Sequence, residues 1–485
     1  MYGFSMIKRK KQILILFLSI FIISLLLPVN VIAQTEVISI NDAINNALKN
    51  NKDISIARLN VAKSEAAVDE AYGYALPRLD FSAGFSHFIK KPLVPFPDFG
   101  ALLKNATYGI LFDENVLPRN EDKFVPVNSV LQSFSRSNNY QTELTLTQTL
   151  FSSAVFKGIG ASGTYYNLAK SELNNQVSKT VLSVQKSFYN VLIAKEVLEI
   201  TKSSFQNAQE NLANVKALFD QGMVSEFDYL QAEVRVENIR PVVLQMENML
   251  QTAKDALKIA MGFDQSKSID VQGDFDYSPF GVNNEEELIN EALQSNFDLK
   301  SLDLKKQVDE AFIELDVSEY WPTIAAFGNY SYSGSSETWA FQNYSSMTVG
   351  VNFAINLWQG NRTKNAVEQS TITFRQTEEQ LQQVKDFTVL SVKSKFLELK
   401  RVEALVEVQN KTVEIAERAY NIAKVRYREG AGSQLELQNA DQDLKQARLN
   451  KVQSIYSYLI TKFELEQILG RTNPEYFSFF SELKD

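Results

Sequence analysis

Few side chains in this sequence could take part in catalysis or bind a metal. His87 is the only histidine in 485 residues, and cysteine is absent, so the usual zinc and copper sites cannot be assembled within one chain. No glycine-rich phosphate loop and no nucleophile elbow is present, and the many aspartates and glutamates follow the surface spacing of helices. We therefore expect neither an enzyme nor a protein that binds a metal or a cofactor.

Composition narrows the class of partner and of fold. The formal net charge is −9, which argues against nucleic acid as a partner. Without cysteine, disulfides and a lipid-modified N-terminal cysteine are also excluded. Only 11 prolines occur, with none between Pro126 and Pro241 and none between Pro322 and Pro474. Such long proline-free stretches suit very long helices.

The N-terminus has the pattern of an export signal. Residues 8–11 are Lys-Arg-Lys-Lys, an apolar run follows at 13–27, and Val31-Ile32-Ala33 is a small-residue cleavage pattern. We predict a signal peptide at residues 1–33; an uncleaved anchor is the alternative, for which the apolar core is short. No later segment approaches the ~20 apolar residues of a membrane helix, so strands would have to do any spanning.

The chain carries an internal duplication. Pro77 and Pro322 are 245 residues apart, and this spacing holds without a gap over about 40 residues. Gly222 and Gly430 are only 208 residues apart, so the first copy contains an insertion, which we place within 88–139. We assign residues 34–270 to the first structural repeat, 271–470 to the second and 471–485 to a C-terminal tail.

Each copy reads as helix, strand, loop, strand, very long helix, tip and long helix. The very long helices are expected at about 152–219 and 361–428, and a rise of ~1.5 Å per residue would make each roughly 100 Å long. Apolar residues recur there at steps of three and four, and the opposite faces are rich in Lys, Glu, Gln and Asn. This pattern is typical of coiled coils with one face exposed to water. One such apolar series is Val177, Val181, Val184, Phe188, Val191, Leu192 and Leu198.

The predicted strands alternate with a period of two. One strand has an apolar face of Met347, Val349, Val351, Phe353, Ile355 and Leu357. Strands of this kind fit a membrane barrel, and a soluble sandwich core is the alternative. Four strands are too few to close a membrane barrel, so the barrel interpretation requires three chains with twelve strands.

With this pattern the sequence resembles the TolC-like outer membrane efflux protein family, from about Ser39 to Gly470. The resemblance depends on the duplicated plan, on Pro77 and Pro322 where helices enter strands, and on two paired tips. The tips read Leu218-Phe219-Asp220-Gln221-Gly222-Met223-Val224-Ser225-Glu226-Phe227-Asp228 and Arg426-Tyr427-Arg428-Glu429-Gly430-Ala431-Gly432-Ser433-Gln434-Leu435-Glu436.

The resemblance implies an α+β membrane protein: a homotrimer with a 12-stranded β-barrel, four strands per chain, in the lipid of the outer membrane, continued by a long α-helical coiled-coil tunnel in the periplasm. It implies a passive export duct of a tripartite efflux or secretion system, with a periplasmic adaptor protein and an inner-membrane pump as partners. The residues that would contact the adaptor are Gly222, Met223, Val224, Ser225, Gly430, Ala431, Gly432 and Ser433.

The resemblance also implies a gate near these tips, held by polar links and lined by acidic rings. Asp228 and Tyr427 match two linking residues, and Glu436 matches the first ring position. Asn439 occupies the second ring position and is neutral, and Gly432 stands where the family has an arginine. Three Glu436 carboxylates around one narrow channel would attract cations and disfavour anions; a solvated helix position is the alternative.

Two further interpretations of function remain open from the sequence. The same duct could serve type I protein secretion, or the chain could be a non-conducting periplasmic coiled-coil scaffold or adhesin. The insertion at 88–139 contains five prolines and many apolar residues. We expect it outside the cell, folded over the barrel mouth and narrowing it.

Overall fold

The computed structural model describes residues 36–275, 277–281 and 284–479. The predicted signal peptide and the end of the predicted tail lie outside the described residues. The chain divides into two compact units. We call Ala62–Leu168 with Asp303–Glu379 the strand unit, and the remaining described residues the helical unit. Each unit contains segments from both repeats.

The helical unit contains most of two long helical hairpins, each made of two helices joined at a tip. α5 (Ser153–Asp220) turns into α6 (Glu226–Met261), and α9 (Arg362–Arg428) turns into α10 (Gln434–Ile468). Both very long helices lie within a residue or so of their predicted limits. The predicted apolar series of α5, from Val177 to Leu198, is buried throughout, which confirms that the three- and four-residue steps mark the packed face.

Shorter elements accompany the two hairpins. α2 (Ile40–Asn50) leads into α3 (Lys52–Gly73), and α7 (Glu285–Ser295) leads into α8 (Phe297–Val317). Two of them, α3 and α8, continue from the helical unit into the strand unit. A short parallel pair joins β1 (Glu36–Ile38) to β6 (Ile269–Val271), and α11 (Glu475–Ser478) lies near the end of the described chain. α2 and the β1–β6 pair pack with α5 and α6 in one buried apolar cluster, and α7 packs with α9 and α10 in a second.

The duplication is visible in equivalent contacts of the two repeats. The Asn51 side chain donates to the Ala260 carbonyl at 2.9 Å, and the Asn296 side chain donates to the Ile468 carbonyl at 2.9 Å. Gly262 and Gly470 end the second helix of each hairpin with φ of 66° and 72°. A Cβ at Gly262 would lie 2.3 Å from the carbonyl oxygen of Asn50, and one at Gly470 would lie 2.4 Å from that of Ser295. Each repeat therefore requires glycine at this turn.

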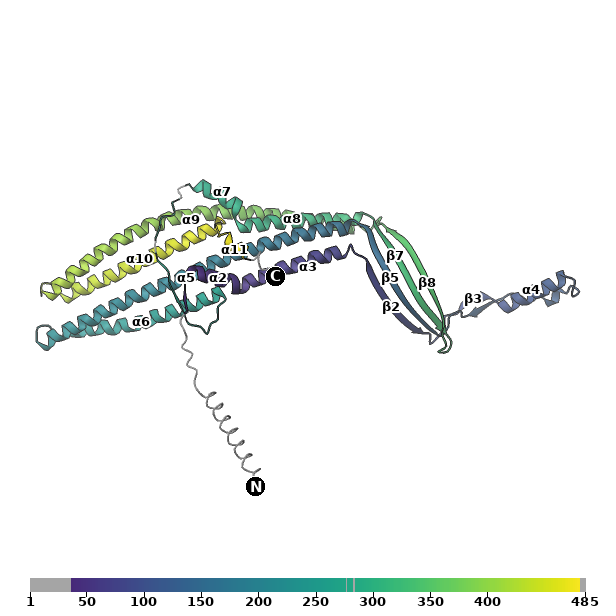
Figure 1. Cartoon of the computed structure of the whole chain (residues 1–485), viewed down its shortest axis with the longest axis horizontal. Coiled ribbons are helices and arrows are strands. Elements are labelled where there is room, and N and C mark those ends of the chain that lie inside the picture. The colour runs from purple at the N-terminus through teal and green to yellow at the C-terminus, as the bar shows by residue number, and fades with distance from the viewer. Residues whose placement is uncertain (1–35, 276, 282–283, 480–485) are drawn as a thin grey trace, which may run out of the picture. The chain divides into compact units, whose positions relative to one another are not determined.

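The strand unit contains an antiparallel sheet in the order β2-β5-β7-β8. Its strands are β2 (Arg78–His87), β5 (Asn138–Ser152), β7 (Thr323–Ser336) and β8 (Gln342–Ala354), which lie side by side (Figure 1). β8 ends at Ala354, so Ile355 and Leu357 lie beyond the strand on which we placed them. The sequence after Ala354 is Ile-Asn-Leu-Trp-Gln-Gly-Asn, where Gly360 and Asn361 adopt positive φ as the chain turns into α9.

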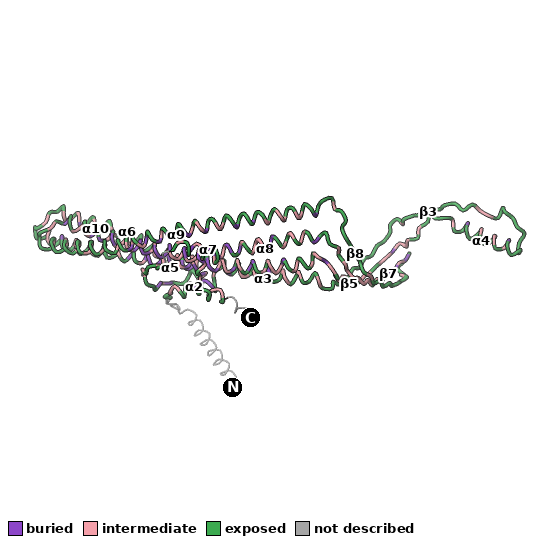
Figure 2. Tube along the Cα trace, turned by 90° about the horizontal axis from the view of Figure 1, so that it is seen from above, coloured by how far each residue is buried: buried purple, intermediate pink, exposed green. Residues whose placement is uncertain are grey.

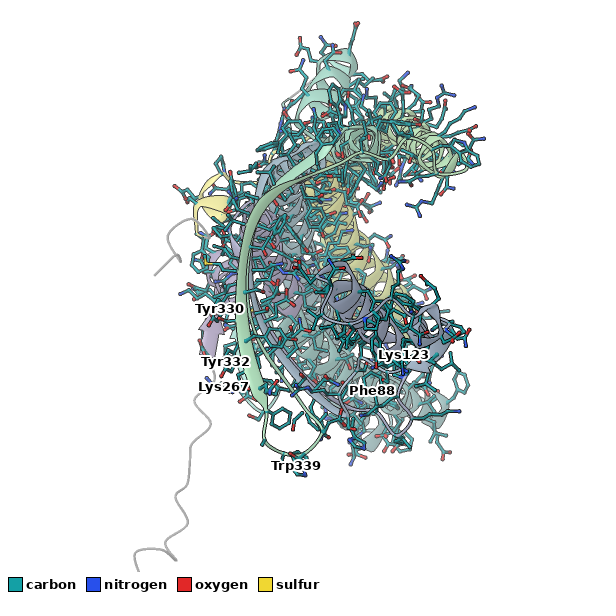
Figure 3. All side chains as sticks on the ribbon, turned by 90° about the vertical axis from the view of Figure 1, so that its right-hand side faces the viewer. Phe88, Lys123, Lys267, Tyr330, Tyr332 and Trp339 are labelled. Carbon is teal, nitrogen blue, oxygen red and sulfur yellow. The ribbon has the colours of Figure 1, made fainter. Side chains whose placement is uncertain are left out.

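The register places apolar residues of all four strands on one face. Phe81 lies opposite Leu144, which lies opposite Tyr330, which lies opposite Met347. Tyr330 and Tyr332 lie along β7, and Trp339 lies in the loop that follows it (Figure 3). The other face carries Ser82, Glu143, Ser331 and Ser346 at the adjacent register positions, as expected for strands with lipid on one side and water on the other.

The insertion lies between β2 and β5, as predicted, and is folded. It contains β3 (Val94–Pro97), α4 (Phe99–Asp113), a 3-10 turn at Glu121–Lys123 and β4 (Ser129–Gln132). β3 and β4 pair in antiparallel fashion. Among the described residues, no helix is both long enough and apolar enough to cross a membrane.

Candidate gate at the hairpin tips

The first tip is formed by a glycine at the end of α5 and a serine cap at the start of α6. Gly222 takes φ of 72°, which lets the Met223 N–H reach the Leu218 carbonyl at 2.9 Å. Ser225 then caps α6: its hydroxyl accepts from the Asp228 N–H at 3.2 Å and donates to the Asp228 carboxylate at 2.7 Å. The Asp228 carboxylate therefore faces its own cap.

The second tip repeats this geometry. Gly430 takes φ of 71°, and the Ala431 N–H reaches the Arg426 carbonyl at 2.8 Å. Ser433 caps α10 by accepting from the Glu436 N–H at 3.2 Å. The two tips are thus equivalent in backbone and differ in the charged side chains they carry.

Glu436 has a cationic neighbour that its sequence position did not reveal. Its carboxylate lies 3.8 Å from the Arg426 guanidinium, which also donates to the Ala431 carbonyl at 3.1 Å. A Cβ at Gly432 would lie 3.1 Å from both the Arg426 Cβ and the Glu436 carboxylate. Glycine at 432 therefore leaves room for the Arg426–Glu436 pair.

Tyr427 and Asp228 come from different hairpins and lie near each other. Burial raises the pKa of the Tyr427 hydroxyl, and the negative charge of Asp228 raises it further. Beside Tyr427, a cleft with a volume of about 650 Å³ separates α5 from α9, with Asn211, Asn214 and Lys424 among its lining residues. The hairpins are therefore not fully packed against each other behind this pair.

The other predicted tip residues are largely exposed. Met223 and Ala431 are exposed and Val224 is half-buried, while Asn439 is exposed on the first turns of α10. Phe227 and Leu435, which the sequence analysis did not single out, are also exposed apolar side chains at the two tips.

A buried carboxylate that the sequence analysis missed joins the two hairpins. Asp441 of α10 lies 2.6 Å from the Arg235 guanidinium of α6 and accepts from the Asn207 side chain of α5 at 3.1 Å. The Ser204 hydroxyl of α5 lies 3.4 Å away. The spacing of Asp441 could have identified it from the sequence. It falls in the buried series of α10, seven residues after Gln434 and three before Leu444.

A second charged link lies farther from the tips. The Glu464 carboxylate of α10 accepts from Lys186 of α5 and from Lys395 of α9, each at 2.5 Å. Burial by itself would raise the pKa of Glu464, but the two lysines outweigh burial and hold this pKa below its ordinary value. No group of three histidine, aspartate or glutamate side chains within the described part of the chain is arranged to hold a metal ion.

Comparison with known proteins gives this architecture a family. Residues 125–263 and 288–471 match the model of the outer membrane efflux protein family. The outer membrane protein TolC of Salmonella enteritidis is 23% identical over 349 residues, 70% of each chain. The chain is also similar to two solved structures. For CusC the TM-score is 0.68 at 17% identity, and the match covers 90% of this chain and 94% of that one. For the Campylobacter jejuni outer membrane channel CmeC the TM-score is 0.68 at 17% identity, and the match covers 89% of this chain and 85% of that one.

The chain therefore belongs to the outer membrane efflux protein family. It is a TolC-like efflux channel of the outer membrane and not an enzyme. The predicted family, the duplicated fold of long helices and strands, the location and the channel function are confirmed.

Proposed function

We propose that three copies of this chain form one passive export duct. The proposal is carried by the sheet, which has one apolar face, one polar face and two edges, β2 and β8, that lack a partner strand among the described residues. Unpaired strand edges cannot lie in lipid, and four strands are fewer than the eight of the smallest membrane barrels. Three copies supply twelve strands and pair every edge.

We propose a periplasmic adaptor protein and an inner-membrane pump as partners. The two tips expose apolar side chains, among them Met223, Phe227 and Leu435, in a segment far along the chain from the strands. Exposed apolar groups on a rigid, capped turn suit docking to another protein. The pump would supply the energy, because the duct itself contains no nucleotide-binding motif.

The gate is proposed at the same tips. Threefold symmetry would place three copies of Glu436 around one axis. The negative charge of each copy would be partly neutralised by its Arg426. We assign Tyr427 and Asp228 the linking role at this level, where the Asp228 carboxylate accepts from the Ser225 hydroxyl, and the Asp441–Arg235 pair joins the two hairpins directly.

The oligomeric state and conductance of the detergent-extracted protein test the proposal. We expect a mass of three chains by light scattering and discrete conductance steps in planar bilayers. Extraction from outer membranes should require detergent. A single-chain species, or release by alkali without detergent, would instead indicate a non-conducting periplasmic scaffold.

A further inference from the structure

The helix α4 in the insertion has an apolar stripe that nothing in the described chain covers. Phe99, Leu103 and Ile110 are exposed, and Leu103 retains 60% of its surface. With the exposed Ala106 they follow steps of four, three and four residues, which line up on one face of a helix. Most residues of α4 are coloured as exposed or intermediate in the trace (Figure 2).

The opposite face of α4 is packed, so the stripe belongs to a folded element. Phe112 is buried and contacts the rings of Tyr108 and Phe124. Asn105 donates to the Val125 carbonyl and accepts from the Val125 N–H, each at 2.8 Å. α4 thus has an inner side fixed to the following segment and an outer side that is apolar and free.

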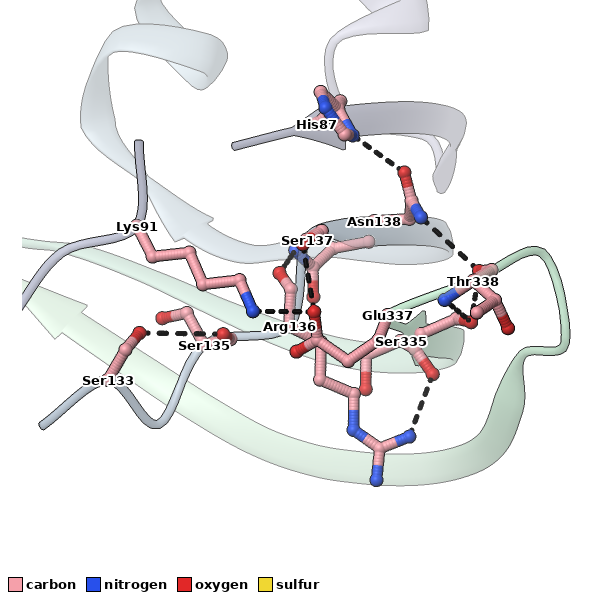
Figure 4. Close-up of polar contacts among 12 residues, drawn as sticks. His87, Lys91, Ser133, Ser135, Arg136, Ser137, Asn138, Ser335, Glu337 and Thr338 are labelled. Carbon is pink, nitrogen blue, oxygen red and sulfur yellow. Dashed lines mark hydrogen bonds and ion pairs between the residues drawn. The ribbon is translucent and has the colours of Figure 1, made fainter. Parts of the chain in front are cut away.

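The root of the insertion is attached to the end of the sheet by a polar cluster (Figure 4). Lys91 pairs with Glu337 at 2.5 Å, and the Ser137 hydroxyl donates to the same carboxylate at 2.9 Å. The Asn138 side chain donates to the Thr338 carbonyl at 3.2 Å, and His87 lies 2.7 Å from Asn138. Both flanks of the insertion are therefore held to the β7–β8 loop.

The β3–β4 ribbon separates α4 from this root. Four residue pairs join the two strands, and at ~3.3 Å per residue the ribbon adds about 13 Å. α4 follows β3 directly and therefore lies beyond the strand ends (Figure 1). This position favours a protein partner over lipid, which faces the strands themselves.

We propose that the apolar stripe of α4 packs against the α4 stripes of the other two copies, forming a three-helix cap above the sheet end. This inference rests on the proposed trimer. The insertion departs from β2, an edge strand that must pair with another copy, so its root lies at the boundary between copies. The stripe carries no charge between Phe99 and Ile110, because Lys104 lies about 100° away around the helix. Between Phe99 and Ile110 three such stripes can meet without repulsion, and their spacing is that of a short coiled coil; the exposed Asp113, three residues after Ile110, ends the apolar stripe.

Cysteine cross-linking tests the cap, since the natural chain has no cysteine to confuse the result. In Leu103→Cys, mild oxidation of outer membranes should give a disulfide-linked dimer band, because two of three thiols meet at the axis. The matched control is Lys104→Cys, the adjacent exposed position about 100° away around the helix, which should give at least tenfold less dimer.

Two further measurements separate the possible failures. If chemical cross-linking shows a trimer but Leu103→Cys forms no more dimer than Lys104→Cys, the cap is refuted while the duct stands. If no trimer forms, the proposed function fails with it. A fluorophore attached to the thiol of the Leu103→Cys variant that is quenched by brominated lipid would overturn the cap in favour of insertion into the membrane surface.

Discussion

At the scale of single residues, the second tip shows how one position compensates for another. A side chain at 432 would crowd both Arg426 and Glu436, so glycine there permits an arginine six residues earlier to approach the acidic position. The ion pair is about half exposed and its atoms are 3.8 Å apart, so it contributes little to stability. Its effect is electrostatic, because it partly neutralises the proposed ring.

Substitution of Glu436 and Arg426 should change ion selectivity in opposite directions. Glu436→Gln removes three negative charges per trimer and should lower cation selectivity and cation block in planar bilayers, with little effect on assembly. Arg426→Ala removes the neutralising positive charges and should raise both the cation selectivity and the cation block. Glu429→Gln, which alters another exposed acid of the same tip that is paired with Arg428, serves as the control. Selectivity unchanged by Glu436→Gln would assign this residue to the solvated face.

Glu464 should make stability depend on acidity. Its folded pKa is held below the ordinary value of 4.5 by Lys186 and Lys395, although burial opposes them. A lowered carboxyl pKa stabilises the fold above that ordinary value, and the stabilisation is lost as the pH falls through the folded value. We expect the unfolding temperature of the purified protein to drop in this acidic range.

The variant Glu464→Gln should be less stable at pH 7, by about 1–2 kcal/mol because the lysines are partly exposed. It should also lose the part of the acid dependence that belongs to Glu464. An acid profile identical to that of the unmodified chain would show that other carboxylates govern the transition.

At the scale of elements, the sequence predicts the helices better than the contacts between them. The limits of α5 and α9, the glycine stops and the Ser225 and Ser433 caps follow from local rules. The partners of Asp441 cannot be predicted from such local rules, because they depend on which faces of α5, α6 and α10 meet after folding. The end of β8 at Ala354 was also missed, because apolar alternation continues through Leu357 while the backbone is already turning.

Removing the Asp441 carboxylate should loosen both hairpins. Asp441→Ala leaves Arg235, which is largely buried, without its partner, at a cost of about 3–5 kcal/mol. Chemical denaturation should reveal this loss, and single-channel conductance should rise because three helices are no longer tied together. Arg235→Ala should act in the same direction. The double variant should cost less than the sum of the two single variants; strict additivity would argue against direct coupling.

At the scale of the whole molecule, the sequence predicted the four strands, their shared apolar face and the place of the insertion. It did not predict that the insertion contains its own helix and ribbon. The five prolines surround the short apolar series of α4 and obscure it, and α4 is fixed by contacts with Phe124 and Val125 that lie outside the helix.

Deleting residues 92–126 should widen the mouth of the duct. The deletion removes α4 and β3 but keeps Lys91, Arg136 and Ser137, so the root cluster and the sheet should survive. We expect a higher single-channel conductance, while the protein remains trimeric. Equal conductance before and after deletion would show that the insertion does not narrow the path.

The interleaved order of the two units along the chain has a consequence for biogenesis. Delivered N-terminus first, the polypeptide completes the last strand of the sheet at Ala354, whereas α9 and α10 follow it in the chain and α10 ends only at Ile468. The apolar face of the sheet thus enters an aqueous compartment before the helical unit can finish folding. We therefore expect nascent protomers to depend on a holding chaperone during this interval, and depleting such a factor should make them aggregate before channels assemble.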